Sequence, residues 1–305
     1  MKKVAITGAT GFIGGSLVRK LLQMDVFIYG IDVETSKWDE FLPYTNFAPI
    51  TASFEDYERL PSIINDSEVE IFYHFAWAGG FTSAIRDYRL QLQNATYAGD
   101  ALIAAKEMGC RKFVYAGTYN QFEIQNFLLS EDFQPRYTCI YSTGKTAASL
   151  ICRTLAFHHE IEYTAGLIPM PYGENNYSRQ LSNVVIDSLN KGISPKLVEG
   201  KNIYDLVYIG DIVDAFIAIG ERGKNQREYY VGHRKLKTFR ELIIDIRNII
   251  APNVELKFGE YEDYQNIDYS MINLEALYND TGFECKADFE KTIKDTAKWV
   301  KTLNL

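Results

Sequence analysis

The chain has 305 residues, of which 47% are hydrophobic, so it can form one large domain or two closely joined ones with a sizeable core. Its formal net charge of −8 and isoelectric point of about 5.2 exclude the global positive field that attracts nucleic acid or anionic lipid. The four cysteines are scattered without a CxxC pair, which indicates reduced thiols and predicts no metal site.

The first residues do not fit a cleavable leader or a membrane anchor. The apolar run at 4–6 is broken at once by Thr7 and Gly8, and Arg19 and Lys20 fall where a leader stays apolar. No run of about 18 apolar residues occurs in the sequence. We therefore expect a cytoplasmic protein that binds no membrane and no nucleic acid.

Strand-like apolar runs alternate with helical patterns through the first half of the chain. The expected strands cover residues 2–8, 26–32, 69–78, 111–118 and 163–170, and the expected helices cover 11–23, 87–109 and 141–159. Strands that alternate with long helices predict right-handed βαβ units. The fold class is therefore α/β, a doubly wound parallel sheet covered on both faces.

After about residue 170 this alternation loosens. A polar loop at 171–180 and a helix at 181–192 precede a strand that leads into a helix at 204–220. We assign the domain that holds most of the sheet to 1–170, with 203–236 contributing to its sheet. We assign a smaller, interleaved substrate-binding lobe to 171–202 and 237–305.

Gly8, Gly11 and Gly14 have GxxGxxG spacing after the first expected strand, at the start of a helix. Such a turn lets backbone amides approach a pyrophosphate, although an ordinary packing turn can contain the same glycines. Asp32 ends the second expected strand, where a carboxylate accepts hydrogen bonds from the adenosine ribose. Because this carboxylate repels a 2′-phosphate and no arginine follows it closely, we expect NAD rather than NADP.

Tyr141 and Lys145 are four residues apart and therefore share one face of an expected helix. A tyrosine can act as acid or base near neutral pH only if its phenolate is stabilised, and a neighbouring ammonium group does this. A YxxxK motif is common by chance in a chain with 21 tyrosines. Its position strengthens the interpretation, because the preceding expected strand ends at Thr118, whose hydroxyl can bond the same substrate oxygen.

The ordered set of these motifs resembles the extended short-chain dehydrogenase/reductase family of nucleotide-sugar enzymes, the NAD-dependent epimerases and dehydratases. The resemblance covers essentially the whole chain and includes segments 171–176, 204–219 and 229–243. It implies a Rossmann fold, a bound NAD and a nucleotide-diphosphate sugar as substrate. It also implies that Tyr141 is the catalytic acid or base, that Lys145 binds ribose and lowers the tyrosine pKa, and that Thr118 orients the sugar.

The resemblance and the strand ends together give a larger set of candidate site residues. The expected cofactor-binding residues, besides Tyr141 and Lys145, are Gly8, Thr10, Gly11, Phe12, Ile13, Gly14, Asp32, Ala76, Trp77, Ala78 and Asn94. A plain helix-surface role for Asn94 and a core-packing role for Trp77 remain alternatives. The expected substrate-binding residues are Tyr119, Gln121, Asn175, Asn176, Arg179, Asn183 and Asp205.

Departures from the family pattern bear on the reaction. The 4,6-dehydratases of the family carry an acidic pair after the catalytic threonine, whereas Tyr119 and its two successors are not acidic here. Many 4-epimerases carry an arginine where Tyr204 precedes Asp205, so the diphosphate must be held in another way. The C-terminal stretch is more similar to the 4-ketoreductases that finish CDP- or dTDP-activated deoxysugars, such as abequose synthase.

Three functions therefore stay open. The leading prediction is reduction of a 4-keto-deoxyhexose on a nucleotide diphosphate, with Tyr141 as the acid. The alternative is a 4-epimerase that uses tightly held NAD⁺, and the less favoured third is a non-catalytic dinucleotide-binding protein. In this family two long helices, here at 88–108 and 141–158, commonly form a dimer interface, so a homodimer is expected.

Overall fold

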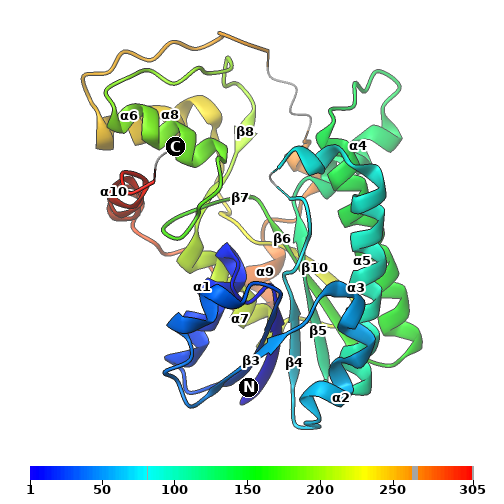
Figure 1. Ribbon diagram of the computed structural model, residues 1–305. Coiled ribbons are helices and arrows are strands. Elements are labelled where there is room, and N and C mark those ends of the chain that lie inside the picture. The colour runs from blue at the N-terminus through cyan, green and yellow to red at the C-terminus, as the bar shows by residue number, and fades with distance from the viewer. Residues whose placement is uncertain (81, 263–266, 304–305) are drawn as a thin grey trace.

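A sheet of seven strands forms the centre of the computed structural model, which describes residues 1–80, 82–262 and 267–303 (Figure 1). Every neighbouring pair of strands is parallel. In spatial order the strands are β10 (Arg227–Tyr230), β6 (Glu162–Ile168), β5 (Lys112–Thr118), β4 (Ile71–His74), β1 (Lys3–Thr7), β2 (Phe27–Asp32) and β3 (Phe47–Thr51). The predicted doubly wound parallel sheet is confirmed.

The order of the strands reverses between β1 and β4, which are neighbours in space although β2 and β3 separate them in the chain. In such sheets a crevice opens beyond the carboxyl ends of the strands at the reversal, and ligands bind there. The central strands are almost entirely buried because helices cover both of their faces; β5 is buried at every position.

Helices α1 (Phe12–Leu22) and α7 (Ile209–Arg222) cover one face of the sheet, with α9 (Ala276–Thr281) beside α7 (Figure 1). Helices α3 (Tyr88–Glu107) and α5 (Thr138–His158) cover the other, next to the short α2 (Leu60–Ile64). Small residues let α3 and α5 approach closely. A Cβ on Gly144 of α5 would lie 2.7 Å from the backbone oxygen of Gln91 on α3, so a side chain does not fit there.

The remaining elements form a lobe at one end of the sheet, drawn at the upper left of Figure 1. Helices α6 (Leu181–Asn190), α8 (Phe239–Ile250) and α10 (Phe289–Val300) share a separate apolar core. Two small sheets join this lobe to the rest of the protein: β8 (Ile203–Tyr204) pairs with β11 (Lys237–Thr238), and β7 (Met170–Tyr172) pairs with β9 (Leu206–Tyr208).

The structure divides two segments that the sequence presents as single units. The run at 163–170 is split because Pro169 cannot donate a ladder hydrogen bond, so β6 ends at Ile168 and Met170 begins β7 in another sheet. Within 203–236, β10 joins the main sheet and α7 packs on it, whereas β8 and β9 pair outside it.

Short elements complete the described part of the chain. They are α4 (Gln121–Leu129) and four 3₁₀ turns, η1 (Thr35–Glu40), η2 (Phe54–Arg59), η3 (Ser83–Arg86) and η4 (Tyr269–Met271). Among the described residues, none of the helices combines the length and the apolar character that crossing a membrane requires.

Candidate active site

A cavity of about 570 Å³ lies at the carboxyl ends of the central strands, where the strand order reverses. This volume is typical of pockets that hold small molecules and cofactors. The glycine turn after β1 and the end of β2 form one wall, the loop after β4 and the ends of β5 and β6 form another, and residues 169–180 cover it. The predicted site residues that line it are Gly8, Thr10, Gly11, Phe12, Ile13, Gly14, Asp32, Ala76, Trp77, Ala78, Thr118, Tyr141, Lys145 and Asn176.

The glycine turn is built so closely that side chains do not fit in it. Gly8 has a φ of +68°, which favours glycine, and a Cβ on Gly14 would lie 2.1 Å from the Gly8 oxygen. Gly11 donates its N–H to the Gly8 oxygen at 3.0 Å and precedes α1, which no side chain caps. The first N–H groups of α1 are therefore available to an anion in the cavity, as a pyrophosphate requires.

Asp32 fixes the turn as well as facing the cavity. Its Oδ2 accepts hydrogen bonds from the Thr10 N–H at 3.0 Å and from the Thr10 hydroxyl at 2.9 Å, and its Oδ1 accepts one from the Val33 N–H at 2.8 Å. The carboxylate is partly exposed and lines the cavity. Glu34 and Lys37, which follow Asp32 in the chain, also line the cavity, although no sequence motif pointed to them.

The loop after β4 is held by two buried amide side chains of α3. Asn94 pairs with the backbone of Ala78, accepting from its N–H at 3.0 Å and donating to its oxygen at 2.9 Å. Gln91 accepts a hydrogen bond from the indole Nε1–H of Trp77 at 2.8 Å. Asn94 does not line the cavity, so it acts on the loop. Gln91 was not predicted. The only feature of the sequence that points to it is its position on the buried face of the expected helix.

Tyr141, Lys145 and Thr118 meet at one side of the cavity, because the first turns of α5 pass the end of β5. Burial raises the pKa of the Tyr141 phenol, and a hydrogen bond with the Thr118 side chain acts in the opposite direction. Burial lowers the pKa of Lys145 to about 7. The Lys145 ammonium donates to the Ala116 oxygen at 2.8 Å. These three side chains can hold and protonate a substrate oxygen.

The predicted substrate-binding residues are placed less uniformly. Asn176 is buried and lines the cavity; its Oδ1 accepts from the N–H of Ser178 at 3.1 Å. Asn183 lies behind it and donates to the backbone oxygens of Asn176 at 2.7 Å and Ser178 at 2.8 Å. Asn175 and Arg179 do not line the cavity, and Arg179 is exposed. Ser178 and Gln180 line it without having been singled out.

Tyr119, Gln121 and Asp205 are buried beside the cavity and do not line it. The Gln121 Oε1 accepts from the Thr118 N–H at 3.1 Å, so it positions the end of β5. Asp205 accepts from the Tyr230 hydroxyl at 2.9 Å and from the backbone N–H of His233 at 2.9 Å. These side chains support the walls of the site.

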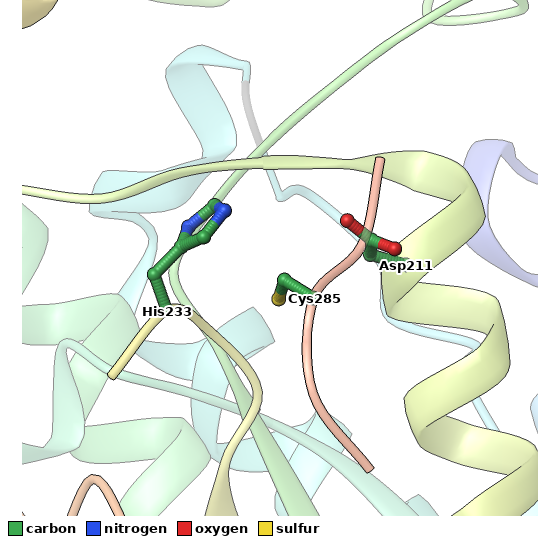
Figure 2. A group of neighbouring side chains, drawn as sticks. All are labelled: Asp211, His233 and Cys285. Carbon is green, nitrogen blue, oxygen red and sulfur yellow. The ribbon is translucent and has the colours of Figure 1, made fainter. Parts of the chain in front are cut away.

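A second cluster of polar side chains lies outside this cavity. Asp211, His233 and Cys285 bring one possible metal-ligand atom each within 4.8 Å of one another, and Cys285 lies between the other two in Figure 2. They come from the first turn of α7, the loop after β10 and the segment before α10. Burial, followed by the negative charges of Asp211 and its neighbours, raises the pKa of the Cys285 thiol. The thiol is therefore protonated near neutral pH.

Hydrogen bonds within the protein already engage two members of this cluster. The two carboxylate oxygens of Asp211 accept from the backbone N–H groups of Lys286 and Ala287, each at 3.1 Å. The Nδ1 of His233 donates to the Asp205 Oδ1 at 2.7 Å. We interpret the cluster as an anchor that fastens the segment before α10 to α7.

Comparisons with known proteins identify the family. The family model described as "NAD dependent epimerase/dehydratase family" matches residues 4–232. The chain belongs to this family. The predicted family is confirmed, the protein is an enzyme of the extended short-chain dehydrogenase/reductase type, and NAD is the cofactor on which the family depends.

Three relatives are distant in sequence but align with this chain over nearly their whole length. The chain is 23% identical over 305 residues to "CDP-abequose synthase" of Salmonella typhimurium, covering 97% of each chain. It is 23% identical over 323 residues to human "dTDP-D-glucose 4,6-dehydratase", covering 98% of this chain and 90% of that one. The structure of "UDP-Glucuronic acid 4-epimerase from Bacillus cereus in complex with UDP-Glucuronic acid and NAD" matches with a TM-score of 0.79 at 18% identity, covering 98% and 99%.

Proposed function

We propose that the protein reduces the 4-keto group of a deoxyhexose carried on a nucleotide diphosphate, using NADH. The observation that carries the proposal is the meeting of Thr118, Tyr141 and Lys145 in the cavity that the glycine turn also lines. A hydroxyl, a phenol and an ammonium group at one wall, opposite a site for pyrophosphate, form the arrangement that hydride transfer to a carbonyl needs.

The residues of the cavity fit the dinucleotide. The crowded turn of Gly8 and Gly14 leaves the start of α1 open to a pyrophosphate, Asp32 is placed for the hydroxyls of a ribose, and Lys145 lines the same cavity. When bound, NADH supplies the hydride that reduces the substrate carbonyl carbon.

The chain's own residues orient and protonate the oxygen of that carbonyl. The Tyr141 phenol donates its proton to the oxygen as the new C–H bond forms, and Thr118 Oγ1 donates a hydrogen bond that orients the same oxygen. Lys145 stabilises the phenolate that remains. Because burial raises the pKa of Tyr141, the phenol is held protonated, as a proton donor must be.

The side chains after Thr118 argue against water elimination. Gln121 is committed to the Thr118 backbone at 3.1 Å. Glu123 is the first acidic residue of this segment; it is fully buried, forms an ion pair with Arg136 at 2.7 Å and does not line the cavity. A 4,6-dehydratase needs an acid and a base at the sugar, and these residues supply neither.

The nucleotide-sugar end of the cavity is rich in neutral polar groups. Asn176, Ser178 and Gln180 line it, and Gln180 precedes α6, which no side chain caps. We propose that these groups and the first amides of α6 hold the diphosphate in place of arginines, with Asn183 fixing the loop. The similarity to CDP-abequose synthase supports a CDP- or dTDP-linked substrate.

A 4-epimerase is the alternative, and the likeness to the B. cereus epimerase favours it. The two functions use the same side chains but differ in cofactor balance. A reductase consumes NADH in proportion to product, whereas an epimerase retains its NAD⁺ and leaves the nicotinamide absorbance unchanged.

We expect the purified protein to oxidise one NADH per sugar when it is given CDP- or dTDP-4-keto-6-deoxyhexoses. The measurement is the fall in nicotinamide absorbance, with the reduced sugar nucleotide quantified by chromatography in the same sample. The same panel with UDP-hexoses and no added cofactor tests epimerisation. Interconversion of UDP-hexoses without turnover of any keto sugar would replace the reductase by the epimerase.

We also propose that the protein forms a homodimer through α3 and α5 and acts in the cytoplasm. Both helices carry large apolar side chains that are exposed in the single chain; these are Tyr88, Leu92, Leu150, Ile151 and Phe157. Sedimentation equilibrium is expected to give twice the chain mass of 34.9 kDa. Leu150→Glu is expected to give the single mass, because a charge in the middle of a dimer interface is destabilising.

A further inference from the structure

Trp77 contacts both of the proposed catalytic residues of α5. The Nζ of Lys145 lies 3.9 Å from the centroid of its indole ring, well within cation–π distance. The Tyr141 ring stands almost perpendicular to the indole, at an interplanar angle of 86° and a centroid separation of 6.1 Å. One half-buried aromatic side chain therefore lies beside both members of the YxxxK motif.

The indole ring is held in a fixed orientation. Its Nε1–H donates to the Oε1 of Gln91 at 2.8 Å. The amide nitrogen of Gln91 donates to the backbone oxygens of Gly79 at 3.2 Å and Ala84 at 3.0 Å. Because Gln91 is fully buried and both ends of its amide are used, the oxygen must face Trp77. The position of the indole face is therefore set by α3.

The Lys145 ammonium has few partners besides the indole face of Trp77. Among the described residues it forms no salt bridge; it donates to the Ala116 oxygen and lies 5.1 Å from the centroid of the Tyr115 ring. Its burial lowers its pKa to about 7, so small differences in its surroundings change its charge at physiological pH.

Four titratable groups near Lys145 are neutral near pH 7. Burial raises the pKa of Tyr141 and of Cys152 on α5, and it raises that of Tyr115 on β5 well above its usual value. Burial lowers the pKa of His74 on β4 to about 3, so its imidazole is uncharged. None of these four groups is an anionic partner, and the contacts of the ammonium are with two aromatic faces and one carbonyl oxygen.

We propose that Trp77 is a positioning residue, whose indole face takes the place of an anionic partner for the Lys145 ammonium and keeps it charged beside Tyr141. Its meaning for catalysis rests on the proposed function. The contact itself is measurable without turnover, so the two proposals can fail separately.

The direct test is the protonation midpoint of Lys145 in the full chain, followed by NMR of ¹³Cε-lysine-labelled protein and assigned with Lys145→Met. Trp77→Leu is expected to lower this midpoint by about one pH unit, the size that a desolvated cation–π contact accounts for. Trp77→Phe is expected to lower it by less, because the phenyl ring keeps a weaker negative face. Trp299→Phe, the same substitution on α10, is the control and is expected to leave the midpoint unchanged.

Each result decides the proposal. An unchanged midpoint in Trp77→Leu overturns it, whether or not the protein is active. Equal shifts in Trp77→Leu and Trp77→Phe also overturn it, because the contribution then comes from the lost bond to Gln91. Trp77→Phe keeps an aromatic ring in the core and covers the case in which Trp77→Leu does not fold.

The pH dependence of kcat is a second measurement, and a simple loss of packing would not shift it. Catalysis needs Lys145 as the ammonium, so activity falls as the pH rises through its pKa. Removing the indole moves this alkaline limit of kcat to lower pH by about the shift seen by NMR, about one unit. If the midpoint shifts but no nucleotide sugar is turned over by the unaltered protein, the Trp77 contact stands and the proposed function fails.

Discussion

Tyr141→Phe is expected to lower kcat by about 10²- to 10⁴-fold, the contribution of a positioned acid or base, while the protein still binds NAD. In the proposed mechanism the phenol transfers its proton to the substrate oxygen, and Thr118 only orients that oxygen. Removing one oxygen from a ring that remains packed beside Trp77 changes little else. The measurements are steady-state turnover of the keto sugar and the dissociation constant of NAD by fluorescence titration.

Tyr137→Phe is a matched control, one helical turn earlier in the chain. Its side chain is 65% exposed and contacts Arg86 outside the cavity, so turnover is expected to be unchanged. Full turnover in Tyr141→Phe would contradict the assigned role. Normal NAD binding in both variants, with no turnover by the unaltered protein on any sugar nucleotide, would favour a dinucleotide-binding protein that does no chemistry.

The longer helices and the central strands were predictable from the sequence, the helices from periodic burial and the strands from short, mostly apolar runs. The expected helix at 87–109 is α3, whose start is fixed by the Asp87 side chain accepting from two backbone N–H groups. The expected strand at 111–118 is β5 within one residue. By contrast α4 was not predicted. No side chain caps it, and Phe127, Leu128 and Leu129 are exposed, so its apolar residues do not mark a buried face.

The motif residues of the site were predictable because the topology brings them together. The carboxyl ends of parallel strands meet at one edge, so Gly8 and Thr118 converge whatever lies between them in the sequence. The substrate wall was less predictable. The Asp205 carboxylate is a group that can bind a ligand, but here it accepts hydrogen bonds from the Tyr230 hydroxyl and the His233 backbone N–H. A sequence does not show which partner a polar side chain takes.

Gly14→Ala and Gly15→Ala are expected to change the protein in opposite directions, although the two positions are adjacent on α1. A Cβ on Gly14 would lie 2.1 Å from the Gly8 oxygen and 2.9 Å from its carbonyl carbon, so the backbone of the turn must move. We expect a loss of about 1–3 kcal/mol in the free energy of unfolding, the usual cost of overpacking. NAD affinity should fall about tenfold or more, since each tenfold corresponds to about 1.4 kcal/mol.

A Cβ on Gly15 meets its nearest neighbour, the Ala9 oxygen, at 3.4 Å, an ordinary contact. Replacing this helical glycine by alanine then stabilises the protein by about 0.5–1 kcal/mol and leaves NAD affinity unchanged. Denaturant unfolding and NAD titration of both variants measure the two effects. Equal NAD binding by Gly14→Ala and the unaltered protein would show that the turn does not hold the pyrophosphate. Weak binding by both variants would mean that added volume anywhere in the first turn of α1 is harmful, and the specific role of Gly14 would be lost.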